Sequence, residues 1–223
     1  ELKIPIFAEL YSFLSRLTHL ASNETDALAY WAKANDVKEH YRYSVRQGID
    51  GQENEMTVGE IKHFLDAIIV KTEQGISSAK KNGLFATYFY HEVTDYEKLS
   101  KAGAKPFIKP KKFKRHDLPL FLEGFVHAMR VTENKSEAKN LYQKVRNSPL
   151  FDAKLKMYKV NADLSKETEE IGRTRIFPRG WLENESIWLH MEYKFLLEIL
   201  RAGLYEEFYE NFDILIPFLK PEQ

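Results

Sequence analysis

Side chains that can hold a ligand gather in one short stretch, FPRGWLENESIWLH, which spans residues 177–190. Arginine and histidine bind anions, and Trp181 offers a flat apolar face on which a sugar ring can stack. The carboxylate of Glu183 and the amide of Asn184 can exchange hydrogen bonds with hydroxyl groups. This combination indicates a pocket for a polyhydroxylated or phosphorylated ligand.

A helix predicted over residues 185–202 positions the second half of the stretch. Its apolar side chains cover most of the circumference, which is typical of a buried helix. Ser186 and His190 are four positions apart, so the predicted helix carries them on one face. The free N–H groups at its N-terminus favour an anion such as phosphate.

These positions predict two sets of contacts. The arginines at 173, 175 and 179 bring positive charge just upstream of the helix. The expected sugar contacts are Arg179, Trp181, Glu183 and Asn184, and the expected phosphate contacts are Ser186 and His190.

Each of these residues also has a purely structural interpretation. Asn184 can serve only as a helix N-cap, and Glu183 can complement the helix dipole together with Glu185. Trp181 can pin the loop to the helices, and a single histidine on an apolar helix, such as His190, is more often a core residue. The sequence leaves both interpretations open.

The segment RIFPRGWLENESIWLH resembles a segment of cellobiose-phosphorylase-like glycoside phosphorylases. That segment reads aromatic-x-Pro-Gly-x-x-Glu-Asn-Gly-Gly-aliphatic-aromatic-x-His. The matching positions here are Pro178, Glu183, Asn184, Ile187, Trp188 and His190. The following helix pair, which ends in GLYEEFYENF, is similar to the next hairpin of the same family.

The resemblance implies an (α/α)6 toroid and the phosphorolysis of a β-glucoside, with an oligosaccharide and inorganic phosphate as substrates and no other cofactor. It also implies that His190 is a phosphate ligand. The family's catalytic aspartate belongs to an Asp-Trp-Asn-Asp motif that this chain lacks, so the catalytic residue stays unknown. Glu185 and Ser186 replace the family's Gly-Gly pair. We therefore expect the isolated chain to be inactive and the remainder of a parent chain to supply the acid.

An alternative function belongs to another class. The chain can be a non-catalytic α-helical binding or scaffold module that contacts a partner protein through residues 177–190. An exposed Trp181 without a concave site nearby favours this alternative.

Apolar residues recur at helical spacing along most of the chain. The pattern predicts helices at about 7–20, 24–46, 57–82, 117–129, 136–145, 185–202 and 204–219. A short strand is expected near 84–93, and the segments up to 116 and from 147 to 184 read as irregular. We therefore expect an all-α fold of toroid-like helical hairpins that forms a single unit over 1–223. The chain starts without methionine and stops soon after an apolar helix, so we expect it to be part of a longer protein.

The composition of the chain limits which classes of partner it is expected to bind. The 33 basic and 33 acidic residues give a formal net charge of zero, which offers no general attraction to nucleic acid or to a membrane. The basic stretch 105–116 is interpreted as a solvated crossing loop. The absence of cysteine excludes thiolate metal sites, and no pair of histidines has zinc-ligand spacing, so we expect no metal. No apolar run is long enough to span a bilayer, and we expect a cytoplasmic protein.

Overall fold

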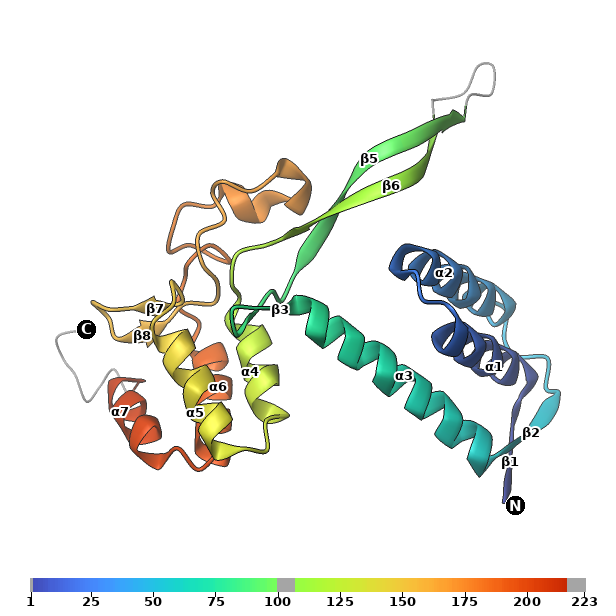
Figure 1. Ribbon diagram of the computed structural model, residues 1–223, viewed down its shortest axis with the longest axis horizontal. Coiled ribbons are helices and arrows are strands. Elements are labelled where there is room, and N and C mark those ends of the chain that lie inside the picture. The colour runs from blue at the N-terminus through green and yellow to red at the C-terminus, as the bar shows by residue number, and fades with distance from the viewer. Residues whose placement is uncertain (1, 100–106, 216–223) are drawn as a thin grey trace. The chain divides into compact units, whose positions relative to one another are not determined.

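The structure is a computed structural model that describes residues 2–99 and 107–215, and it divides into two compact units after Ser78 (Figure 1). The first unit consists of two paired strands and three helices. In chain order these are β1 (Lys3–Phe7), α1 (Ala8–Asn23), α2 (Ala27–Ser44), β2 (Glu53–Thr57) and α3 (Val58–Ala79).

Local signals explain where the helices of the first unit begin. The Asp26 side chain accepts a hydrogen bond from the Ala29 N–H at 2.7 Å and caps α2. At the start of α3, the Thr57 N–H donates to the Glu60 carboxylate at 2.8 Å, and the Glu60 N–H donates to Thr57 Oγ1 at 3.1 Å. This reciprocal pair is a capping box.

The first unit has very little core. Its buried apolar side chains are Ala21, Val37, Met56 and Ala67, and three of these four are small. The larger apolar residues of its helices are half-buried or exposed. Burial of apolar surface is the main stabilising term in folding, so this unit keeps much apolar surface available for other contacts.

The second unit contains the hydrophobic core. Its elements are β3 (Lys80–Lys81), β4 (Leu84–Phe85), β5 (Phe89–Leu99), β6 (Phe107–Asp117), α4 (Leu122–Arg130), α5 (Lys135–Arg146), β7 (Phe151–Asp152), β8 (Met157–Tyr158), two short 3-10 helices (Glu169–Ile171 and Arg173–Ile176), α6 (Leu189–Arg201) and α7 (Tyr205–Leu215). Helices α4 to α7 enclose side chains with almost no exposed area, among them Phe125, Val145, Phe195 and Ile199. The strand β8 adds Tyr158 to the same core.

The predicted all-α fold with an (α/α)6-like toroid is wrong. The seven α-helices of the described residues lie near the predicted positions, but four two-stranded antiparallel sheets accompany them, so the fold is mixed α and β. The largest difference is the long hairpin of β5 and β6, which replaces the predicted short strand near 84–93 and the predicted loop up to residue 116 (Figure 1).

Cross-strand charge pairing accounts for this hairpin. The acidic strand β5 lies along the lysine-rich strand β6, so Glu92 pairs with His116 at 2.8 Å and Glu97 with Lys111 at 3.4 Å. Opposite charges on facing strands stabilise a sheet. The sequence of either strand alone reads as polar loop, because the partner that offsets its charge lies about twenty residues away.

The sequence predicts a helix that continues to residue 82, but the helix in the structure is shorter. Helix α3 stops at Ala79, and the Asn82-Gly83 pair instead forms the turn between β3 and β4, with φ of 53° and 76°. Both residues have positive φ, as a two-residue hairpin turn requires. The sequence cue was the same for a helix stop and for a hairpin.

Among the helices that the structure describes, none combines the length and the apolar character needed to cross a bilayer.

Candidate functional site

Residues 178–185 form a tight double turn that presents Trp181. The Trp181 N–H donates to the Pro178 carbonyl at 3.0 Å, and the Asn184 N–H donates to the Trp181 carbonyl at 3.0 Å. The Gly180 N–H donates to the Asn184 carbonyl at 2.7 Å and closes the loop. Gly180, Leu182 and Glu185 have φ of 84°, 46° and 58°, so the backbone reverses direction repeatedly. For the two non-glycine residues this conformation has to be held by the surroundings.

Two fully buried asparagines hold the turn in place. Asn184 Oδ1 accepts from the Leu164 N–H at 3.0 Å, and Asn184 Nδ2 donates to the Phe177 carbonyl at 2.8 Å. Asn161 Nδ2 donates to the Glu183 carbonyl, and Asn161 Oδ1 accepts from the Glu185 N–H at 2.7 Å. Buried amides with both ends bonded give the backbone one defined arrangement. Asn184 is therefore a structural residue of the loop.

A buried carboxylate closes the base of the turn. Glu185 is 8% exposed, and its carboxylate accepts hydrogen bonds from the Arg179 guanidinium (Nε and Nη2) and from Lys159 Nζ at 2.7 Å. The hydrogen bond from Arg179 lowers the pKa of Glu185, with Lys159 acting in the same direction, while burial opposes both. The pKa of Arg179 is correspondingly raised by Glu185. The carboxylate is thus ionised and fully committed to this pair of cations.

The surface of the turn carries three of the four predicted sugar contacts, Arg179, Trp181 and Glu183, whereas Asn184 is buried. Trp181 is 59% exposed and its neighbour Leu182 is 44% exposed, whereas Glu183 is half-buried. The Arg179 side chain is 67% exposed although its head group binds Glu185. Within the described residues the Glu183 carboxylate has no hydrogen-bond or ion-pair partner, so it is available to a ligand.

The two predicted phosphate contacts are separated. Helix α6 begins at Leu189 and not near residue 185, because Glu185 is left-handed and its N–H is bonded to Asn161. Ser186 consequently lies outside the helix, and its hydroxyl donates to the Leu182 carbonyl. The prediction that Ser186 and His190 share a helix face, with Asn184 as the N-cap, is therefore wrong.

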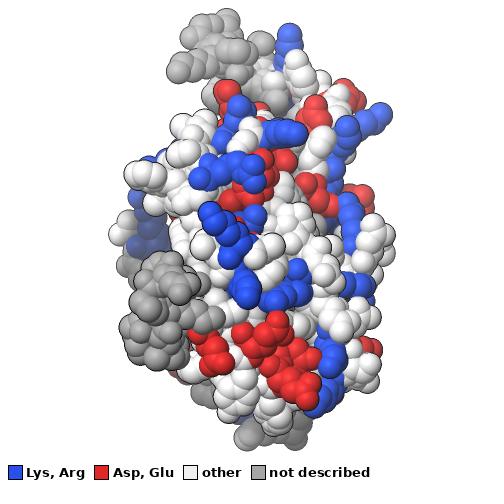
Figure 2. Space-filling model, turned by 90° about the vertical axis from the view of Figure 1, so that its left-hand side faces the viewer, with Lys and Arg blue, Asp and Glu red and all other residues white. Residues whose placement is uncertain are grey.

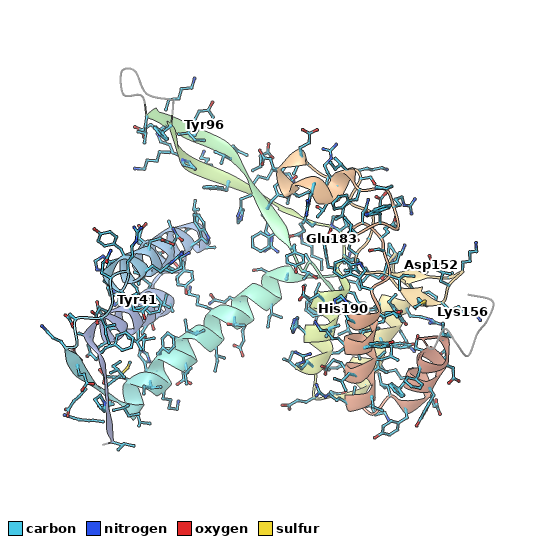
Figure 3. All side chains as sticks on the ribbon, turned by 180° about the vertical axis from the view of Figure 1, so that it is seen from behind. Tyr41, Tyr96, Asp152, Lys156, Glu183 and His190 are labelled. Atoms are coloured by element: carbon cyan, nitrogen blue, oxygen red, sulfur yellow. The ribbon has the colours of Figure 1, made fainter. Side chains whose placement is uncertain are left out.

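His190 is exposed at the start of α6, on a different element from Glu183 (Figure 3). Its ring lies 5.3 Å from that of Trp188, which packs against the core. Among the residues that the structure describes, His190 forms no hydrogen bond or ion pair. Its role as an anion ligand stays a prediction.

Sequence reasoning missed three residues of this region. Asn161 and Lys159 anchor the turn from a segment more than twenty positions away, and no local pattern marks them. Glu192 on α6 is 1% exposed; Glu192 Oε1 accepts from the Tyr158 N–H at 2.5 Å, and Oε2 has no partner in the described part of the chain. Burial raises the pKa of Glu192 to about 7. The helix also carries His190, Lys194, Glu198 and Arg201, so its sequence gives no cue that singles out Glu192.

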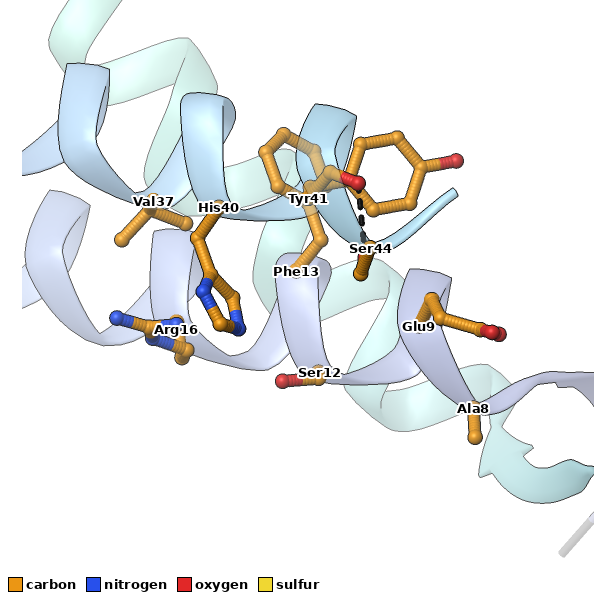
Figure 4. A pocket seen from close by; sticks show the side chains of 9 residues that line it. All are labelled: Ala8, Glu9, Ser12, Phe13, Arg16, Val37, His40, Tyr41 and Ser44. Carbon is orange, nitrogen blue, oxygen red and sulfur yellow. Dashed lines mark hydrogen bonds between the residues drawn. The ribbon is translucent and has the colours of Figure 1, made fainter. Parts of the chain in front are cut away.

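The first unit holds a separate pocket of about 230 Å³ between α1 and α2. In Figure 4 the His40 ring points between the two helices, while the Glu9 carboxylate and the Arg16 guanidinium lie at opposite ends. The rings of Phe13 and Tyr41 contact each other beside them in a tilted arrangement, with centroids 4.9 Å apart. The polar groups of this pocket do not converge on one point, so the pocket lacks the arrangement that fixes a small ligand.

Charge and metal-binding groups add no second candidate. The surface drawn in Figure 2 shows basic and acidic side chains next to each other. The described residues contain no cluster of three or more histidine and carboxylate side chains that would hold a metal ion.

A comparison of the sequence with protein-family models finds no match, and a search of curated proteins finds no relative. The likeness of residues 175–190 to glycoside phosphorylases therefore rests on those residues themselves.

Proposed function

We propose that this chain binds an oligosaccharide at the turn formed by residues 178–185, with Trp181 as the stacking platform. The observation that carries the proposal is that a rigid, internally bonded turn exposes a tryptophan. Buried amides and a buried ion pair fix the backbone on both sides of Trp181. A tryptophan whose backbone is already fixed loses less conformational entropy when a ligand stacks on its ring.

The polar groups around Trp181 suit a sugar. The apolar C–H face of a pyranose ring packs against an indole, and its hydroxyl groups need donors and acceptors at the ring edge. The Glu183 carboxylate supplies acceptors, and the exposed Arg179 side chain supplies donors beyond those that Glu185 uses. Leu182 extends the apolar surface beside the indole.

The resemblance to glycoside phosphorylases supports a β-glucoside as the sugar. In such a reaction a carboxylic acid protonates the glycosidic oxygen while inorganic phosphate attacks the anomeric carbon from the opposite face. The Ser186 hydroxyl donates to a backbone carbonyl, so it does not suit phosphate binding. Glu185 is paired with two cations, so it does not suit the role of the acid. We assign the sugar contact to the Trp181 turn and the phosphate contact of such a reaction to His190.

Titration calorimetry with cellohexaose and laminarihexaose tests the proposal on the purified protein. Trp181→Ala should weaken binding at least about tenfold, the equivalent of about 1.4 kcal/mol for a lost stacking platform. Trp31→Ala is the matched control, because Trp31 is 64% exposed on α2 in the other unit. It should bind as the unmodified protein does.

Two results would overturn the proposal. One is that neither glucan binds the unmodified protein. The other is that Trp181→Ala and Trp31→Ala lower the affinity equally, which indicates non-specific stacking. The exposure of Trp181 also suits the alternative function of a protein-binding module, which is favoured if the glucans fail but a partner protein binds through Trp181.

A further inference from the structure

Helix α3 carries an exposed apolar stripe with the spacing of a coiled coil. Residues at alternating intervals of four and three lie on one side of the helix: Val58, Lys62, Leu65, Ile69, Thr72 and Ile76. The four aliphatic members are 44%, 52%, 54% and 47% exposed in chain order. Ala67, the residue of α3 that is buried, lies on the opposite side. The stripe is thus a second face of the helix, separate from the one that packs within the unit.

We propose that this stripe is a dimerisation seam, and that a second copy of the chain covers it with its own α3 in antiparallel orientation. The order of polar and apolar residues along the stripe supports this arrangement. The stripe consists of two sets of residues spaced by seven: Val58, Leu65 and Thr72, and Lys62, Ile69 and Ile76. In an antiparallel pair of helices, each residue of one set faces a residue of the other set. One register places Ile69 opposite Leu65 of the second copy and Ile76 opposite Val58 of the second copy.

The same register also pairs the polar residues of the stripe with each other. Lys62 then faces Thr72 of the second copy, so the two polar residues of the seam meet each other and no aliphatic side chain faces an ammonium group. The lysine stem can lie over the threonine methyl while its charge reaches solvent. Asp66 lies beside the two-fold axis, and its charge is offset by Lys62 of its own helix at 2.5 Å.

A parallel pair fits less well. It would place Lys62 directly opposite Lys62 of the second copy, and like charges in facing core positions are unfavourable. A parallel pair also gives no polar partner to either lysine. The sequence of the seam therefore selects the antiparallel arrangement.

The small hydrophobic core of the first unit also favours association with a second copy. Few apolar side chains of its helices are fully buried within the unit, so association removes apolar surface that folding leaves exposed. One helix pair buries less area than a permanent dimer interface. A reversible dimer, whose population rises with concentration, is the expected state.

Sedimentation velocity over a range of protein concentrations tests this directly. The unmodified protein should shift from monomer to dimer, and Leu65→Glu should raise the dissociation constant at least about tenfold. Val70→Glu is the control: Val70 is 49% exposed but lies off the seam, so this variant should dimerise normally. Circular dichroism should show the same helix content for all three proteins.

The chain lacks cysteine, which allows the orientation to be tested by disulfide formation. A protein with both Lys62→Cys and Thr72→Cys should form a covalent dimer on mild oxidation, whereas Lys62→Cys alone should not. A monomer at every concentration, or equal effects of Leu65→Glu and Val70→Glu, would refute the seam. Covalent dimers of Lys62→Cys alone would refute the antiparallel register.

Discussion

Arg179 and Glu185 clamp the two sides of the Trp181 turn through hydrogen bonds from one guanidinium to one carboxylate. The two residues are six positions apart, and the turn that presents the tryptophan lies between them. Lys159 joins the same carboxylate from a distant segment of the chain. The geometry of the proposed sugar platform therefore depends on the buried Glu185 carboxylate, which binds both cations and is not itself a proposed sugar contact.

Removal of the Glu185 charge should loosen the turn. Glu185→Gln leaves the half-buried Lys159 ammonium without its counter-charge, and we expect the free energy of unfolding to fall by about 1–3 kcal/mol. This is less than for a fully buried ion pair, because solvent screens the exposed Arg179 side chain. Urea unfolding measures the loss. Because the folded-state pKa of Glu185 is lowered, its contribution is present above the ordinary value and is lost as the pH falls through the folded-state pKa. The difference between variant and unmodified protein should thus shrink in acid.

Glu192 should show the opposite pH dependence. Its ordinary pKa is 4.5 and its folded-state pKa is about 7, so the folded state keeps a proton that the unfolded state releases between these values. Stability should fall by about 3 kcal/mol as the pH rises from 4.5 to 7 and then level off. Glu192→Gln should be equally stable at pH 4 and more stable than the unmodified protein at pH 8. A pH-independent difference between the two would contradict this interpretation.

Two adjacent leucines on α6 test which face of this helix is buried. Leu196 is 3% exposed and Leu197 is 41% exposed. Leu196→Ala should cost about 2–5 kcal/mol, because the truncation removes buried methyl groups and leaves a cavity. Leu197→Ala should cost less than about 1 kcal/mol. Denaturation midpoints that move equally for the two variants would place both side chains in similar surroundings.

The isolated chain should not catalyse phosphorolysis. With cellobiose or laminaribiose and inorganic phosphate, the purified protein should release no glucose 1-phosphate, because no unpaired buried carboxyl lies in the Trp181 turn. Turnover above a protein-free blank would contradict this expectation. Glu183→Gln would then identify whether Glu183 is the acid, with Glu55→Gln as a control on an exposed carboxylate in the other unit.

The positions of the helices follow from the sequence, since each depends on contacts within a few residues. The capping box of Thr57 and Glu60 and the cap of α2 by Asp26 are local arrangements that the residue types specify. The apolar spacing likewise predicts α4 to α6 and the start of α7 within a few residues, while the predicted end of the last helix at 219 lies outside the described residues. The polar and aromatic character of residues 177–190 also marks the one loop that presents an exposed tryptophan.

The remaining features were decided by partners that are distant in the chain. The strand β6 exists because its backbone pairs with β5, and residues 185–188 are not helical because Asn161 binds the Glu185 N–H. Asn184 has the residue type of an N-cap, but its amide is drawn into bonds with Leu164 and Phe177. A hydrogen-bonding side chain specifies only that it needs a partner, and tertiary structure determines which partner it receives.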